Sequence, residues 1–395
     1  MSEPFLMASP GMKRIPRSLL SIPVVLSLVF AQSGPAMSFS FFGARTLPKS
    51  AAGDTSASAS TAKPNPADSK ALEKHMRMGD AFFERKDYTN SLIEYQSVLK
   101  FDADSYKAHF MLGKVLMALS DYQEAHKEFD TVIRLRPRSS DGHFMMAEAL
   151  RMQGDYRQAT REYRQSLKLN SRNSLCHAYL AECYRTKTWY RPAIGECKKA
   201  IRLDNKLVIP HLILGQVYIL DRQTDHGLAE YKKAIELKPD DAMVHARYAQ
   251  ALGGLGKWSD SLPQFVRAAD LDPSYPEAHI GLSWALVNTG KLDEALKEAL
   301  EAVRLAPNNA DAHSNLAAVY QKKGDYQSAV THYRLALKLD PKNPHLHRAL
   351  GLALSDNGEV NAAIAELLAT SRLLPSDYEV KLALQSLMQR RNQNQ

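Results

Sequence analysis

Cysteine is scarce in this sequence: among 395 residues there are only three, Cys176, Cys183 and Cys197. Three thiols in a chain of this length do not make a disulfide framework. Neither sign of charge dominates. Residues 1–71 hold seven of the 51 Lys and Arg and three of the 43 Asp and Glu, which leaves 44 and 40, a net charge of +4, for the rest. We therefore expect no nucleic-acid partner.

Catalytic and cofactor motifs are missing as well. The sequence has no nucleophile elbow, no HExxH zinc-protease motif and no Rossmann fingerprint. Residues Gly253–Lys257 look like a phosphate loop, but they follow no expected strand and lack the GxxxxGK[ST] spacing. We interpret them as a turn between helices, and we expect neither enzyme activity nor a bound cofactor or metal.

A long apolar run stands out only near the N-terminus, where Leu19–Ala31 spans thirteen residues behind the basic run Met12–Arg17. A membrane span needs about 20 residues, so this layout is typical of a cleaved secretory signal peptide instead. We predict a signal peptide over residues 1–36, cut after Ala31 or Ala36, and hence an exported protein, periplasmic or extracellular.

Two alternatives for this region stay open. The first eleven residues precede the basic run, which is consistent with translation that starts at Met12. An uncleaved segment over residues 13–31 would anchor the protein to a membrane, the only membrane contact that we expect.

Residues 37–71 are rich in Ala, Ser, Thr and Pro, a composition that predicts a flexible linker.

The rest of the chain repeats one unit, which is clearest in Ala310–Asn343. Apolar residues at helical spacing predict two amphipathic helices, the first carrying Leu316 and the second Tyr333. Between them, Gly324 suits a left-handed helix end and Asp325 suits the N-cap of the second helix. Neither helix buries its apolar stripe alone, so each pair must pack on the next pair.

This unit resembles the tetratricopeptide repeat family, whose 34-residue signature has Leu-Gly/Ala, Tyr, Ala, Phe/Tyr and Pro at fixed offsets. Here these offsets hold Leu316-Ala317, Tyr320, Ala329, Tyr333 and Pro341. Steps of 34 place nine units over residues 72–377 without an insertion, and their first residues are Leu72, Tyr106, Ser140, Ser174, Val208, Ala242, Pro276, Ala310 and Pro344. The resemblance implies an all-α fold, a right-handed superhelical α-solenoid of antiparallel helix pairs. Residues 378–395 would form a capping helix with a polar tail.

In this family the inner face of the first helices holds partner peptides, so the resemblance implies a concave binding groove. The positions of this face carry apolar residues interspersed with charges, which suits a protein or peptide with apolar anchors. Packing between neighbouring first helices is the alternative role for any one of them. The predicted partner-binding residues are Phe110, Lys114, Met117, Phe144, Glu148, Arg151, Glu182, Arg185, Leu212, Gln216, Ile280 and Trp284.

Histidine occupies the fourth position of every unit, in a file of His75, His109, His143, His177, His211, His245, His279, His313 and His347. One His per unit gives no local pair of metal ligands, so we expect mainly packing, with metal binding or pH sensing as the alternative. The three cysteines lie in the fourth unit, where we expect buried small residues. Gly227, Gly253-Gly254 and Pro263 suggest weak helices and a flexible joint over residues 220–265.

The sequence thus favours an exported scaffold that helps assemble or maintain an envelope or secretion complex. The alternatives are an adaptor in the cytosol and a protein that binds metal or senses pH through its histidines. The family's clamp for acidic chaperone tails uses Lys and Asn at positions held here by Met76 and Asp80, so that partner is not expected. The identity of the partner and the oligomeric state do not follow from the sequence.

Overall fold

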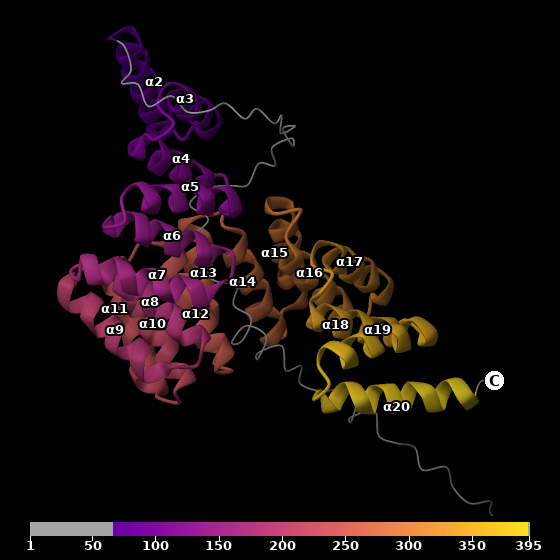
Figure 1. The fold of residues 1–395 in the computed structure, drawn as a ribbon. Coiled ribbons are helices and arrows are strands. Elements are labelled where there is room, and N and C mark those ends of the chain that lie inside the picture. The colour runs from indigo at the N-terminus through magenta and orange to yellow at the C-terminus, as the bar shows by residue number, and fades with distance from the viewer. Residues whose placement is uncertain (1–65, 394–395) are drawn as a thin grey trace, which may run out of the picture.

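The computed structural model describes residues 66–393, which form a curved row of helices with no strand among them (Figure 1). The predicted signal peptide, its cleavage sites and most of the predicted linker lie outside these residues. The first helices of the nine units are α2 Pro66–Glu84, α4 Tyr106–Ala118, α6 Ser140–Met152, α8 Ser174–Thr186, α10 Val208–Leu220, α12 Ala242–Gly254, α14 Pro276–Asn288, α16 Ala310–Lys323 and α18 Pro344–Asp356.

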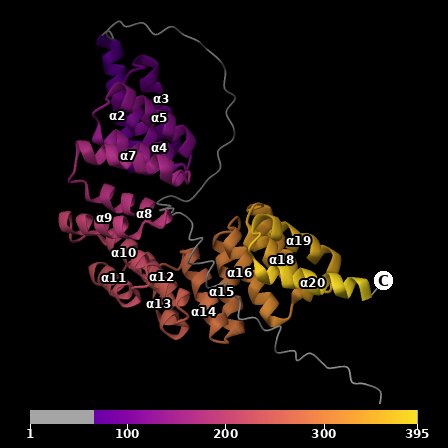
Figure 2. The same ribbon diagram turned by 60° about the horizontal axis from the view of Figure 1, so that its bottom comes forward.

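The second helices are α3 Tyr88–Phe101, α5 Tyr122–Leu135, α7 Tyr156–Leu169, α9 Tyr190–Leu203, α11 Thr224–Leu237, α13 Trp258–Leu271, α15 Leu292–Leu305, α17 Tyr326–Leu339 and α19 Val360–Leu373. A last helix, α20, spans Tyr378–Gln393. From α4 onward, every first helix begins at the residue that the 34-residue register predicts. The α-solenoid of tandem helix pairs is confirmed, and its two ends lie far apart (Figure 2).

Each turn inside a unit uses the same backbone device. The fifteenth residue of every unit has a positive φ, and Gly324, at 85°, closes α16 as predicted. Asp325 then accepts a hydrogen bond from the Ser328 amide at 3.1 Å and caps α17. Four units place a residue with a Cβ at this strained position, a substitution that costs energy: Lys86, Ser120, Thr188 and Arg222.

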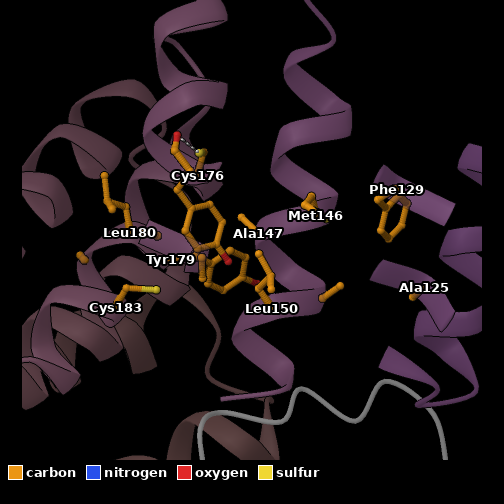
Figure 3. Packing of buried hydrophobic residues seen from close by; sticks show 14 of the residues in the cluster. Ala125, Phe129, Met146, Ala147, Leu150, Cys176, Tyr179, Leu180 and Cys183 are labelled. Atoms are coloured by element: carbon orange, nitrogen blue, oxygen red, sulfur yellow. Dashed lines mark hydrogen bonds between the residues drawn. The ribbon is translucent and has the colours of Figure 1, made fainter. Parts of the chain in front are cut away.

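The core lies between the helices of each pair and between successive pairs. In Figure 3, Tyr179 of α8 lies beside Ala147 and Leu150 of α6, and all three belong to one buried cluster. Small residues at the eighth position let the paired helices approach closely, as at Ala147, which has no exposed surface. First helices of successive units also touch, notably α8 with α10, α12 with α14 and α14 with α16.

The two ends of the array differ from the prediction. Helix α2 begins at Pro66, so residues 66–71 are helical rather than part of the linker. Helix α20 caps the array with Val380, Leu384 and Leu387 buried, but Leu382 faces outward and the helix continues through the tail to Gln393. None of the described helices is long and apolar enough to cross a membrane.

Two glycines in residues 220–265, the predicted flexible joint, have a different role from the one expected. A Cβ on Gly227 of α11 would lie 2.7 Å from the Gly215 carbonyl oxygen of α10, so this glycine permits a close approach of two backbones rather than loosening the helix. A Cβ on Gly253 would likewise meet the Trp258 ring at 2.6 Å. Pro263 does lie inside α13, and α11 packs on α12 less extensively than other second helices pack on the next unit. The flexibility of this joint stays a prediction.

Candidate functional site

The twelve predicted partner-binding residues all lie on first helices, from α4 to α14, and none of them is fully exposed. The structure divides them into two groups. Seven are half-buried: Phe110, Lys114, Met117, Phe144, Glu148, Arg185 and Gln216. Five are buried: Arg151, Glu182, Leu212, Ile280 and Trp284. Only the first group has surface to offer a partner without rearrangement.

The half-buried group is densest on α4 and α6. Phe110 stacks on Tyr106 with ring centroids 6.1 Å apart and meets Phe129 edge-on at the same distance. The Lys114 ammonium lies 4.9 Å from the ring centroid of Phe83, in the first unit. Aromatic and charged side chains therefore alternate along these two helices, a composition that is found at protein-binding surfaces.

A buried charged cluster follows, between the third and fourth units. Arg151 Nη2 donates to Glu148 Oε2 at 3.0 Å, and its Nη1 donates to Glu182 Oε2 at 3.4 Å. The Tyr163 hydroxyl donates to Glu148, and the Arg151 guanidinium lies 4.7 Å over the Tyr179 ring. Burial opposes the charge on Arg151, but Glu148 and Glu182 hold its pKa well above the usual value. This arginine and Glu182 connect two units internally.

The predicted apolar residues of α10 and α14 are buried. Leu212, Ile280 and Trp284 are at most 9% exposed because α10, α12, α14 and α16 contact one another directly. These three side chains, like Arg151 and Glu182, therefore take the packing role that the sequence left open as the alternative. An aspartate at Trp284 is accordingly expected to disturb the core, not only partner binding.

The histidine file proves to be a file of hydrogen-bonded pairs. In seven units the His Nδ1 lies 2.5–2.7 Å from a Glu carboxylate nineteen residues later, on the second helix of the same unit. In His245 the partner is Gln264, and in His313 it is His332. The glutamates are Glu94, Glu128, Glu162, Glu196, Glu230, Glu298 and Glu366.

Most of these imidazoles also place Nε2 against a backbone carbonyl six residues earlier, as His279 does with Pro273 at 3.1 Å. Only a protonated ring donates from both nitrogens. The hydrogen bond to Glu298 accordingly raises the pKa of His279 against the opposing effect of burial. For His109, burial is outweighed by the bonds to Glu128 and to the Ala103 carbonyl, and its pKa is also raised. The rings fasten the two helices of each unit.

This pairing predicts a pH dependence of stability. Folding raises the pKa of such a histidine above the value in the unfolded chain, which is near 6.5. Its contribution to the stability of the folded state is therefore complete below pH 6.5 and is lost as the pH rises through the pKa of the folded state. We expect Glu298→Gln to lower the melting temperature more at pH 6 than at pH 8. Glu294→Gln, on the same helix but away from His279, should not show this difference. A pH-independent effect of Glu298→Gln would contradict the assignment.

The three cysteines are free and buried. The Cys176 thiol donates to the Tyr163 carbonyl at 3.5 Å, and burial raises its pKa to about 12. Burial raises the thiol pKa of Cys183 and Cys197 as well, so none of the three is a thiolate near neutral pH. Across residues 66–393, His, Cys, Asp and Glu form no group of three or more suited to a metal ion.

Sequence reasoning missed the glutamate partners of the histidine file. The signal was present, since Glu recurs nineteen residues after His in seven units. It was not read because the two positions lie on different helices, and only the packed pair brings them together. The cations of α7, Arg157, Arg161, Arg164 and Lys168, were overlooked as well, although their spacing places them on one helix face.

Comparisons with known proteins agree with this architecture. Three tetratricopeptide repeat models match the chain, over residues 110–174 and 247–310, over 211–241 and over 310–343. No curated protein sequence matches it.

Among solved structures, the APC/C hetero-tetramer Cut9–Hcn1 is 13% identical over 82% of this chain and 64% of its own, with a TM-score of 0.56. A tetratricopeptide repeat protein from Parabacteroides merdae is 13% identical over 63% of this chain and 99% of its own, with a TM-score of 0.55. The MamA protein is 20% identical over 44% and 96%, with a TM-score of 0.40. The repeat register, the helix pairs and the matching models together place this chain in the tetratricopeptide repeat family.

Proposed function

We propose that the protein is a scaffold that binds partner proteins, and that the inner face of α4 and α6 is where it does so. The observation that carries this proposal is the half-buried run of Phe110, Lys114, Met117 and Phe144, which presents apolar surface beside charge. Apolar anchors give affinity and interspersed charges give orientation, so an extended peptide or an amphipathic helix suits this surface. Binding, rather than catalysis, is the activity that such a surface supports.

We also propose that the scaffold is exported and acts in an envelope or secretion complex. Support comes from the signal-peptide layout of residues 1–36 and from the linker-like composition that separates it from the array. N-terminal sequencing of the protein recovered from its native cells should begin at Gln32 or Met37. A chain that still begins at Met1 or Met12 would instead favour a membrane anchor or a cytosolic adaptor.

Site-specific photo-cross-linking tests the binding face. A photo-reactive phenylalanine analogue at Lys114 or Met117 should capture a discrete partner in native cells, whereas the same analogue at Lys127, exposed on α5, should not. Lys114→Glu should then weaken binding of the captured partner by about tenfold, the effect of losing one charge-assisted contact of roughly 1.5 kcal/mol. Equal capture from Lys127 would show that the face does not select partners and would remove the proposal.

A further inference from the structure

A solvent-open groove of about 630 Å³ lies on the other side of the third unit, between α7 and the turn that joins α8 to α9. Helix α7 contributes Arg157, Arg161, Arg164 and Lys168, and the turn contributes Lys187 and Trp189. We call these six residues the basic groove. Because the α7 side chains are on the second helix of the unit, the basic groove is separate from the inner face of α4 and α6.

The cations of the basic groove form an uncompensated stripe. On α7 they follow one another by four, three and four residues, so they share one helix face over about 16 Å. All four are exposed, and none of the five cations makes an ion pair within residues 66–393. Glu162, the one acidic residue lining the groove, is held by His143 at 2.7 Å. The like charges repel one another, and the partners of Arg164 and Lys187 among the described residues are the neutral side chains of Tyr184, Thr160 and Trp189.

Three other second helices each pair one cation with a glutamate on the same helix. Lys127 pairs with Glu124 on α5, Lys199 with Glu196 on α9, and Arg304 with Glu301 on α15, each three residues apart. In α7, the residues three positions before Arg164 and Lys168 are Arg161 and Gln165, neither of which is acidic. Helix α9 has the same net charge as α7, and its Arg191, Lys198 and Arg202 follow the same spacing, but α9 has Gly195 where α7 adds a fourth cation, Arg161.

The turn beside α7 is unfavourable in two further ways. Thr188, a β-branched residue, has a φ of 58°, where five other units use glycine. Trp189 stands at the N-cap of α9 and makes no capping bond. Gln223, Lys257, Lys291 and Glu359 of later units make none either, whereas Asp87, Asp121, Asp155 and Asp325 cap the equivalent helices. A missing cap leaves backbone amides at the start of the helix without an acceptor. A positive φ and a missing cap also coincide at Arg222 and Gln223, so this turn is distinguished by its exposed indole and by its place beside the α7 cations.

The exposed indole has a defined setting. Trp189 is 50% exposed, and the Lys187 ammonium lies 5.3 Å from its ring centroid. The same ammonium lies 3.5 Å from the Thr160 hydroxyl of α7, which ties the turn to the basic stripe. Arg164 is steadied by the Tyr184 hydroxyl at 2.9 Å. A half-exposed aromatic ring flanked by fixed cations is an anchor point for a ligand that is both apolar and anionic.

We propose that the basic groove binds an acidic peptide segment of a partner protein, with several Asp or Glu side chains along α7 and one apolar side chain against Trp189. Guanidinium groups bind carboxylates through paired hydrogen bonds, and four cations at helical spacing match an extended acidic run. A nucleic-acid strand is less suited, because the charge of the whole array is nearly balanced. The proposal is independent of partner binding on the inner face.

The test uses a fluorescein-labelled peptide of sequence DDEEFDDE and its amide counterpart NNQQFNNQ, with anisotropy as the readout. The acidic peptide should bind the full chain and the amide peptide should not. Arg161→Ala with Lys168→Ala should weaken binding by at least about tenfold, the effect of losing two charge-assisted contacts. The matched control, Lys338→Ala with Arg372→Ala, removes equal charge from the same outer side of distant units and should change binding by less than about twofold.

A second variant separates binding from folding. Trp189→Asp restores the cap that other units use, so it should raise the melting temperature while it weakens peptide binding. No binding of the acidic peptide, or equal weakening by both double variants, would overturn the proposal. Tighter binding of a single-stranded oligonucleotide of equal charge, lost in the same variants, would replace the peptide with nucleic acid and would also overturn it.

Discussion

Arg151→Ala is expected to lower the free energy of unfolding by about 3–5 kcal/mol, the usual cost of removing one partner from a buried ion pair. Arg151 is 1% exposed and Glu182 is 0% exposed, so the variant leaves the Glu182 carboxylate buried without its arginine. Urea unfolding followed by circular dichroism measures the loss. Hydrogen exchange of the α6 and α8 amides reports whether it falls on the third and fourth units.

A double variant separates two contributions to this loss of stability, the burial of the Glu182 carboxylate without Arg151 and the loss of packing. Arg151→Met with Glu182→Leu removes both charges and keeps apolar volume, so it should recover most of the stability that Arg151→Ala loses. Glu148 keeps the Tyr163 hydroxyl as a donor in both variants. A loss below about 1 kcal/mol in Arg151→Ala would mean that water reaches the cluster and that the pair is not buried in solution.

Gly227→Ala is expected to destabilise the fifth unit by about 1–3 kcal/mol, although alanine is the better helix former. Its Cβ would lie 2.6 Å from Ile219 Cγ1 and 2.7 Å from the Gly215 carbonyl oxygen, and a backbone atom cannot move aside cheaply. Helices α10 and α11 would have to separate. The melting temperature and hydrogen exchange of both helices measure the effect.

Gly195→Ala is the matched control. Gly195 lies in the middle of α9, one unit earlier, with no atom within 4 Å of an added Cβ. Alanine there should raise stability by about 0.5–1 kcal/mol. If both substitutions stabilise, Gly227 is a weak point in α11, as the sequence suggested, and the close approach of the two backbones does not limit this position.

The sequence predicted the repeating architecture because its signals are local. The helical periodicity recurs every 34 residues, and Gly324 with Asp325 adopts the predicted turn. The accessibility of the inner face could not be predicted in the same way. Periodicity places Ile280 and Trp284 on one face of α14, but their burial depends on how closely α12 and α16 approach that helix.

The chemistry of single residues was also hidden from the sequence. From the sequence, a glycine in a helix indicates only a lower helix propensity. The position of the Gly215 carbonyl shows that Gly227 permits a close approach of two backbones. His279 and Glu298 are nineteen residues apart, a spacing that no single helix or turn connects. Trp189 was recognised as unusual only after the structure had shown that Asp155 caps the equivalent helix of the preceding unit.

The His–Glu pairs within the units bear on how such an array can gain or lose units. His347 and Glu366 belong to the same unit, as do the two members of each other His–Glu pair. Duplicating or excising 34 residues therefore leaves the other His–Glu pairs intact. Arg151 and Glu182 do not share this independence, since they come from adjoining units. An insertion of whole units at the boundary between the third and the fourth would therefore separate Arg151 from Glu182, whereas an insertion at any boundary would leave each His–Glu pair intact.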